Sequence, residues 1–178
     1  MALVIFLRGV NVGGHRTFKP SELAAQLGHL DCVNIGAAGT FVIRNRIGKT
    51  TLRAELARRL PFDAGVAICD GRDVTNLTSS APARGKLPPG AVRFVSVLPR
   101  APRATPSLPL RLPPRGRWLV KILAREGRFI VGVYRRDMKT IGHLGSIDRI
   151  FGVPVITRNW NTMMAIERIL AGDPRESR

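Results

Sequence analysis

Apolar residues in the first part of the chain form short unbroken runs and one-sided helical stripes. Ala2–Leu7 is a continuous apolar run, which predicts a central strand covered on both faces of its sheet. Leucines spaced four and then three or four residues apart predict two helices, Pro20–Leu30 and Thr51–Leu60. Further strands are expected at residues 33–36, 41–44 and 65–69. The resulting order, βαββαβ, is that of a ferredoxin-like unit.

The second part of the chain repeats this order in a degraded form. Strands are expected at residues 92–98, 117–123, 129–134 and 153–156, and helices at 147–151 and 161–170. The first helix of the repeat is replaced by residues 99–117, which contain six prolines, five arginines and no acid. Proline at this density disfavours a helix, so a basic, extended loop is expected there.

The fold class predicted from these patterns is α+β. We expect two ferredoxin-like halves packed together, with an additional C-terminal helix. The N-terminal half spans residues 1–78, a connector rich in small residues spans 79–91, and the C-terminal half spans 92–178. A short helix is expected around Asp73–Leu77, just before this connector.

Composition indicates a globular protein of the cytoplasm. The longest apolar runs fall far short of the roughly 20 residues that cross a bilayer, so no membrane partner is expected. The N-terminus shows neither a basic segment nor a small-residue cleavage site. Cys32 directly precedes one predicted strand and Cys69 ends another, which fits buried thiols in a reducing compartment better than a disulfide.

The net charge of +17 is large and uneven. Residues 1–90 carry 12 basic and 6 acidic side chains, whereas residues 91–178 carry 17 and 6. A surface of this charge attracts polyanions, chiefly nucleic acid. Arginine outnumbers lysine 24 to 5, however, and a GC-rich coding bias raises arginine without any ligand. Likewise, the 99–117 loop is either a basic arm that grips phosphates or a solvated surface loop.

The polar loop LRGVNVGGH at residues 7–15 follows the first predicted strand. Its glycines allow close backbone approach, and successive amides before a helix can bind an anion. The predicted anion-binding residues of this loop are Arg8, Gly9, Asn11, Gly13 and Gly14. The alternative is a loop whose Asn and Gly residues only satisfy turn geometry.

Two further segments offer candidate chemistry. TRNWNT at residues 157–162 supplies Arg158 and Asn159 as anion ligands, or else an Asn159 or Asn161 helix cap with Trp160 as a packing anchor. GKTT at residues 48–51 resembles the end of a P-loop, but Ile43 occupies the position where that motif requires an upstream glycine. A helix capped by Thr50 or Thr51 is therefore expected there. We expect the two polar signatures to lie near the interface of the halves.

No metal or catalytic constellation is visible. The histidines lack companion ligands at metal-binding spacing, and the few acids form no obvious pair for acid–base chemistry. We therefore expect neither a metal nor a cofactor.

LRGVNVGG after an N-terminal strand and TRNWNT before a C-terminal helix resemble the bacterial domain of unknown function 1697 family. The resemblance covers about residues 2–170 and implies an α+β fold with ferredoxin-like units, without an established activity. The residues that match the family's two end motifs are Arg8, Gly9, Asn11, Gly13 and Gly14 at the front, and Thr157, Arg158, Asn159, Trp160 and Thr162 at the back. The family's Gln-Ser-Gly-Asn motif falls on Ala37-Ala38-Gly39-Thr40, where only glycine is kept. Gly39, Trp160 and Thr162 are accordingly expected to be structural.

These observations favour a protein that binds nucleic acid or another anionic ligand without catalysis. One alternative is an enzyme acting on a small phosphorylated or carboxylated substrate at the junction of the halves, with Arg8, Asn11, Arg158 and Asn159 positioning the anion. A second alternative is a partner-binding protein that uses the Pro- and Arg-rich loop as its contact.

Overall fold

A computed structural model describes residues 1–11 and 18–172 of the chain. The chain divides into two compact units, Met1–Asn76 with the segment from Met164 onward, and Leu77–Met163. Within the described residues, one antiparallel sheet has four strands and a second has five. The predicted α+β class is thereby confirmed.

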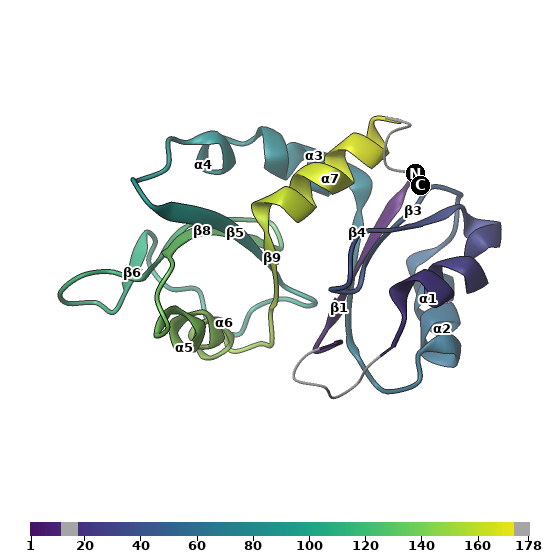
Figure 1. The fold of residues 1–178 in the computed structure, drawn as a ribbon, viewed down its shortest axis with the longest axis horizontal. Helices are drawn as coiled ribbons and strands as arrows, with labels where there is room; N and C mark the ends of the chain where they lie inside the picture. Colours follow the sequence, from purple (N-terminus) through teal and green to yellow (C-terminus); the bar gives the residue numbers. More distant parts are fainter. Residues whose placement is uncertain (12–17, 173–178) are drawn as a thin grey trace. The chain divides into compact units, whose positions relative to one another are not determined.

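The first unit contains the predicted alternation of strands and helices. Its elements are β1 (Leu3–Arg8), α1 (Pro20–Gln26), a 3-10 turn (Gly28–Leu30), β2 (Cys32–Asn34), β3 (Thr40–Ile43), α2 (Lys49–Arg59) and β4 (Gly65–Asp70). The strands lie in the order β2-β3-β1-β4, and each neighbouring pair is antiparallel. The connection from β1 to β2 and that from β3 to β4 each contain a helix (Figure 1).

The core of this unit forms between the sheet and the helices α1 and α2. Ile5 and Phe41 of the sheet belong to one apolar cluster with Leu27, Leu52 and Leu56, and all five are fully buried. The alternate residues of β1 are buried as well, so every side chain from Leu3 to Leu7 is at most 3% exposed. Coverage of β1 on both faces, predicted from its unbroken apolar run, is confirmed.

The second sheet repeats the strand order of the first, with one extra strand at its edge. Its strands are β5 (Ala91–Val97), β6 (Leu110–Leu112), β7 (Val120–Glu126), β8 (Phe129–Arg135) and β9 (Ile156–Asn159). They lie in the order β6-β7-β8-β5-β9. Without β6, the order by position in the chain is second, third, first, fourth, as in the first sheet.

Helices lie on both faces of the second sheet. Helices α5 (Thr140–Gly145) and α6 (Ile147–Phe151) lie on one face, where Phe151 joins Phe94 and Ile122 in the core (Figure 1). Helix α4 (Ala81–Arg84) lies on the other face, at β5. Helices α3 (Gly71–Ser79) and α7 (Trp160–Leu170) each contain a boundary between the units.

Several predicted elements need correction. The strand expected at 153–156 lies three residues later, at Ile156–Asn159. It pairs there with β5, where Arg158 lies opposite Val95. The hydroxyl groups of Thr157 and Ser96 form a hydrogen bond of 2.7 Å between the two strands. The 79–91 connector contains α4, and α5 was not predicted at all. The 99–117 loop contributes β6, so part of it is ordered sheet rather than free surface loop.

No helix among residues 1–11 and 18–172 is both long and apolar enough to cross a membrane.

Candidate functional site

The Asn11 side chain of the first signature closes its own loop. Asn11 adopts a left-handed backbone with φ of 54°. Its Nδ2 donates to the carbonyl oxygen of Ala37 at 2.9 Å, and its Oδ1 accepts from the Phe18 amide at 2.9 Å. Both ends of the carboxamide therefore hold backbone in place, as the turn-geometry alternative requires. Gly13 and Gly14, predicted to bind an anion, lie outside the described residues.

Gly39 supports this loop from the middle segment of the chain. Its φ is 72°, and its carbonyl accepts a hydrogen bond from the Leu7 amide at 2.8 Å. A Cβ at this position would lie 2.8 Å from Val10 Cγ2 and 2.9 Å from Leu7 Cβ. Only glycine fits both the backbone angle and the space. This geometry accounts for a glycine here without any ligand.

The second signature ends a strand and starts a helix. Asn159 is the N-cap of α7, because its Oδ1 accepts from the Thr162 amide at 2.8 Å and from the Thr162 hydroxyl at 3.0 Å. Of the two predicted caps, the structure thus has Asn159. Arg158 is 9% exposed, and burial lowers the pKa of its guanidinium to about 10. Its Nη1 donates to the Thr157 carbonyl at 2.9 Å.

The two signatures belong to different units, residues 7–11 to the first and 157–162 to the second. Their asparagines both hold local structure within their own unit. A shared anion site formed by Arg8, Gly9, Asn11, Arg158 and Asn159 therefore stays a prediction.

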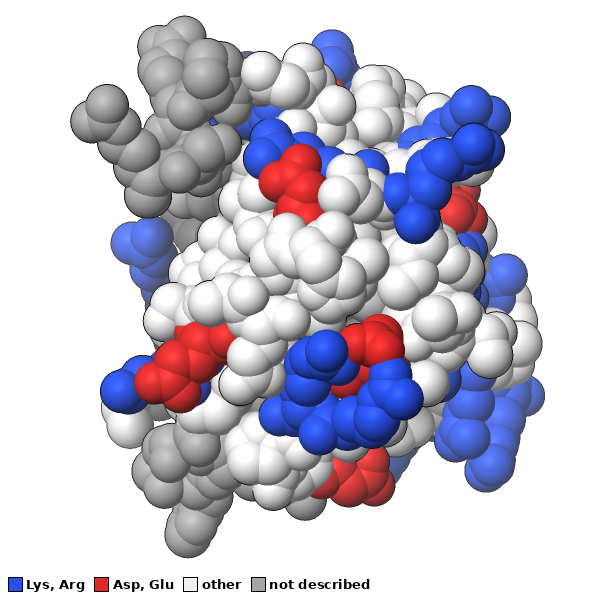
Figure 2. Space-filling model, turned by 90° about the vertical axis from the view of Figure 1, so that its right-hand side faces the viewer, with Lys and Arg blue, Asp and Glu red and all other residues white. Residues whose placement is uncertain are grey.

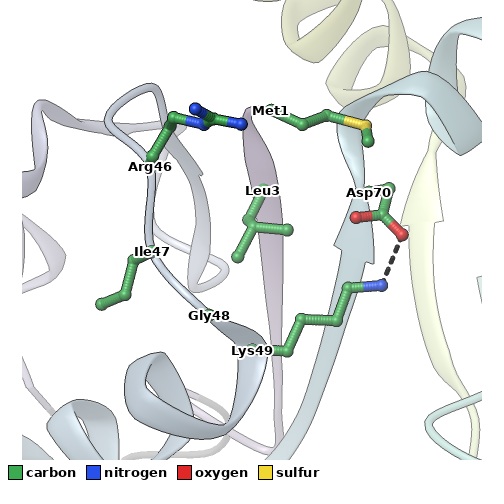
Figure 3. Close-up of a pocket in the computed structure, with 7 residues that line it drawn as sticks. All are labelled: Met1, Leu3, Arg46, Ile47, Gly48, Lys49 and Asp70. Atoms are coloured by element: carbon green, nitrogen blue, oxygen red, sulfur yellow. Dashed lines mark hydrogen bonds and ion pairs between the residues drawn. The ribbon is translucent and has the colours of Figure 1, made fainter.

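A pocket at the start of α2 contains the residues of the GKTT segment (Figure 3). Its volume is about 370 Å³, and its charged lining residues are Arg46, Lys49 and Asp70. The Lys49 Nζ points at the Asp70 carboxylate, 2.5 Å away, so the two charges neutralise each other. The helix begins after Gly48 without a side-chain cap, so the capping predicted for Thr50 or Thr51 is wrong. The Lys49–Asp70 ion pair and the missing upstream glycine at Ile43 do not support a phosphate-binding P-loop at this helix.

Positive charge is concentrated in the second unit. Of the 29 basic and 12 acidic residues of the chain, 16 and three lie between Leu77 and Met163. This unit therefore has a formal charge of +13, and the remainder of the chain has +4. Two of the three acids hold backbone: Asp137 accepts from the Lys139 amide, and Asp148 accepts from the Val155 amide.

Several cations of the first unit form ion pairs with acids. Ion pairs join Lys19 to Glu22, Arg44 to Asp31 and Lys49 to Asp70, and Glu55 contacts both Arg58 and Arg59. Figure 2 looks onto the side of α1 and α2, where blue basic side chains adjoin red acidic ones. Much of the positive charge on this side is therefore paired with a nearby acid.

The second sheet carries cations in register on one face, which we call the cationic face: Arg93, Arg111, Lys121 and Arg135. Arg111 lies directly opposite Lys121, and Lys121 and Arg93 both lie opposite Val133. Residues opposite each other in antiparallel strands point to the same side, so three cations form one row across the sheet. None of the four forms an ion pair with a described Asp or Glu. Like charges placed opposite each other destabilise a sheet, so this row calls for an explanation.

Both tryptophans of the chain contact this face. The Lys121 Nζ lies 4.4 Å and the Arg135 Cζ 4.2 Å from the centroid of the Trp118 ring, and the Arg93 Cζ lies 5.3 Å from that of Trp160. Such cation–π contacts fix the positions of otherwise flexible side chains. Arg93 is 9% exposed and donates to the Gly85 carbonyl after α4, whereas Arg111 is exposed and Lys121 and Arg135 are half-buried.

The cationic face was missed in the sequence, although a signal was present. The triplets Leu110-Arg111-Leu112, Val120-Lys121-Ile122 and Val92-Arg93-Phe94 each place one cation between two apolar residues. This alternation is that of a strand with one buried and one polar face. Only the register shows that the three cations share a row.

The described residues contain no cluster of three His, Cys, Asp or Glu side chains that could hold a metal ion.

Comparison with known proteins supports the fold. Residues 1–111 match the family model described as "Protein of unknown function (DUF1697)". The chain is also similar in structure to the conserved bacterial protein SP0830 from Streptococcus pneumoniae, with 14% identity, a TM-score of 0.60, and 95% of this chain and 98% of that chain covered. At that identity the likeness shows the fold alone. No curated protein is similar enough to match. Because the family model spans well over half of its residues, the chain belongs to the DUF1697 family of proteins of unknown function.

Proposed function

We propose that this protein binds nucleic acid through its second unit, Leu77–Met163. The observation that carries the proposal is the separation of charge between the units, +13 on the second and +4 on the rest of the chain. A GC-rich coding bias raises arginine throughout a chain, but it does not remove acids from one unit. Nucleic acid is the polyanion whose charge density best matches such a surface.

The arrangement of the acids supports the same conclusion. Asp137 and Asp148 accept hydrogen bonds from backbone amides at 2.9 and 2.8 Å, so their oxygens serve local structure. The four cations of the cationic face, in contrast, have no described acid as an ion-pair partner. The charges of Arg111, Lys121 and Arg135 are therefore available to an external anion, whereas Arg93 is only 9% exposed.

We further assign both sheets to ferredoxin-like units. The assignment rests on the strand order, β2-β3-β1-β4 in one sheet and β7-β8-β5-β9 in the other, and on the helices between the strands of the first unit. In the second unit, residues 99–117 with β6 occupy the place of the first helix. Nucleic-acid binding would then use the sheet of the altered copy.

The test is the affinity of the whole protein for nucleic acid across a salt series. Fluorescence anisotropy with labelled 20-nucleotide single strands and duplexes should show binding at 50 mM salt. The logarithm of the association constant should fall linearly with the logarithm of the salt concentration, with a slope of about −0.7 per phosphate contact for single strands and −0.9 for duplexes. Absence of binding at 50 mM salt, or affinity independent of salt, would overturn the proposal.

A further inference from the structure

We infer that the outer part of the cationic face, formed by Arg111, Lys121 and Arg135, is a preorganised site for the phosphodiester backbone of nucleic acid, contacted without regard to base sequence. This inference rests on the proposed function and names the residues that carry it. Arg93 is left out because it is 9% exposed and donates to the Gly85 carbonyl.

The geometry of the row favours phosphate groups. Arg111 and Lys121 lie opposite each other in neighbouring antiparallel strands, which run about 4.7–4.9 Å apart. Their charges repel each other in the free protein, and an anion between or above them removes that repulsion. Guanidinium groups match the oxygens of a phosphate in pairs, while an ammonium serves as a point charge.

Trp118 is the positioning residue of this site. Its ring holds Lys121 at 4.4 Å and Arg135 at 4.2 Å, so two cations from neighbouring strands are kept together before any ligand binds. The Nε of Arg135 is buried and has no hydrogen-bond partner among the described residues. The aromatic contact, rather than an acid, therefore holds the Arg135 guanidinium in place. Ordering these side chains in advance lowers the entropy cost of binding.

The same contacts argue against reading of the bases. Trp118 is 7% exposed and its ring already contacts two cations, so it offers no open surface on which a base can stack. The Trp160 ring is half-buried and lies against Arg93. Contacts to phosphates position a nucleic acid but carry no sequence information. Affinity should therefore be the same for unrelated sequences.

The experiment compares two double variants of the whole protein. The first is Arg111→Gln with Lys121→Gln. The matched control is Arg125→Gln with Arg149→Gln, two exposed arginines of the same unit on the other side of the sheet. Arg125 lies opposite the core residue Ile130, and Arg149 is on α6. Both variants lose two charges, so the overall charge of the unit is the same.

The row variant should lower the magnitude of the salt slope by roughly 1.4 for single strands or 1.8 for duplexes, and reduce affinity at 50 mM salt at least tenfold for two unrelated sequences. The control should keep a slope within 0.5 of the unaltered protein. Equal losses in both variants would overturn the site while leaving the proposed function in place. If the unaltered protein does not bind, the proposed function itself fails.

Trp118→Phe tests the positioning role, because it keeps a buried ring but weakens the cation–π contact. It should lower affinity roughly two- to fivefold at an unchanged salt slope, since no phosphate contact is removed. A thermal melt establishes that the variant is folded at the assay temperature. Unchanged affinity, or a loss confined to one of the two sequences, would overturn the inference for Trp118.

Discussion

The side-chain amide of Asn11 donates a hydrogen bond to the carbonyl oxygen of Ala37, across 26 positions of the chain. Through this bond the first polar signature is attached to the segment that aligns with the Gln-Ser-Gly-Asn motif of the family. The contact uses the backbone of Ala37, so it survives a change of side chain there. The altered middle motif of this chain is therefore compatible with an intact loop.

Asn11→Ala should destabilise the protein by about 3–4 kcal/mol. The change removes two hydrogen bonds, each worth about 1 kcal/mol, and puts alanine at a φ of 54°, which costs roughly 1–2 kcal/mol. Asn11→Gly is the matched control, because it loses the hydrogen bonds but tolerates the backbone angle. Urea unfolding should rank the glycine variant between the parent and Asn11→Ala. Equal stability of the parent and the glycine variant would contradict a role for the bonds.

Gly39→Ala should cost about 3 kcal/mol, whereas Gly36→Ala should cost about 1 kcal/mol. Both glycines have positive φ, 72° and 65°, so both variants bear the left-handed penalty. Only at Gly39 does the new Cβ also meet Leu7 and Val10, at 2.9 and 2.8 Å, and such overpacking adds about 1–3 kcal/mol. The difference between the two unfolding free energies measures the packing term. If the two variants unfold alike, the close approach at Gly39 has no energetic weight.

Asn159→Ala should lower the free energy of unfolding by about 1 kcal/mol, because α7 loses its N-cap. Asn159→Asp keeps an oxygen acceptor and should stay close to the parent. Asn161→Ala, at an exposed position two residues later, should change stability by less than about 0.5 kcal/mol. Chemical denaturation of the three variants distinguishes these outcomes. A larger effect at Asn161 than at Asn159 would refute the assignment of the cap.

Cys32 should resist thiol reagents in the folded protein at pH 8. Burial, with a smaller effect of Asp31, raises the pKa of the Cys32 thiol from its ordinary value of 9.0 to about 12. Only the thiolate reacts, so alkylation should be slow until the chain unfolds in urea. Peptide mapping by mass spectrometry separates Cys32 from Cys69. Alkylation of Cys32 at the same rate in the folded and unfolded protein would contradict the shift.

The same shift has a consequence for stability at alkaline pH. The unfolded thiol loses its proton near pH 9, while the folded thiol keeps it until about pH 12. The unfolded state therefore binds fewer protons in this window, and stability falls as the pH rises through it. Cys32→Ala should remove that part of the decline, which unfolding curves at pH 8 and pH 10.5 can measure.

Apolar pattern alone was sufficient for most elements of the first unit. The spacing of Leu23, Leu27, Leu52 and Leu56 predicts helices that cover the sheet, and all four residues are buried. In these segments local periodicity and tertiary burial point to the same structure. The same agreement holds for the strand Leu3–Arg8, because a short run of consecutive apolar residues predicts a strand that is buried on both faces.

The second unit was harder to predict because its strands depend on partners distant in the chain. Ile156–Asn159 has only one aliphatic residue, and its pairing with Phe94–Val97 appears only once the sheet is assembled. The hydroxyl contact between Ser96 and Thr157 stabilises this pairing. Helix α5 contains Gly142 and Gly145, which lower its intrinsic helical preference, so the local sequence does not predict a helix there.

The candidate site escaped prediction for a related reason. The contiguous polar motifs at residues 8–14 and 157–162 predict an anion site, but the Asn11 and Asn159 side chains hold local structure there. The cations of the cationic face are separated by up to 42 positions along the chain and belong to no motif. The alternation of these cations with apolar residues predicts strands with one polar face, but it does not predict which strands are neighbours in the sheet.

The contacts of Trp118 and Trp160 with the cationic face also make the tryptophan fluorescence of the protein sensitive to that surface. The chain has two tryptophans, and each ring lies against a cation of that face. Indole emission responds to nearby charge, and an anion arriving at Lys121 or Arg135 changes the charge beside the Trp118 ring. Intrinsic fluorescence should therefore report occupancy of this surface directly, with no label on either the protein or its ligand.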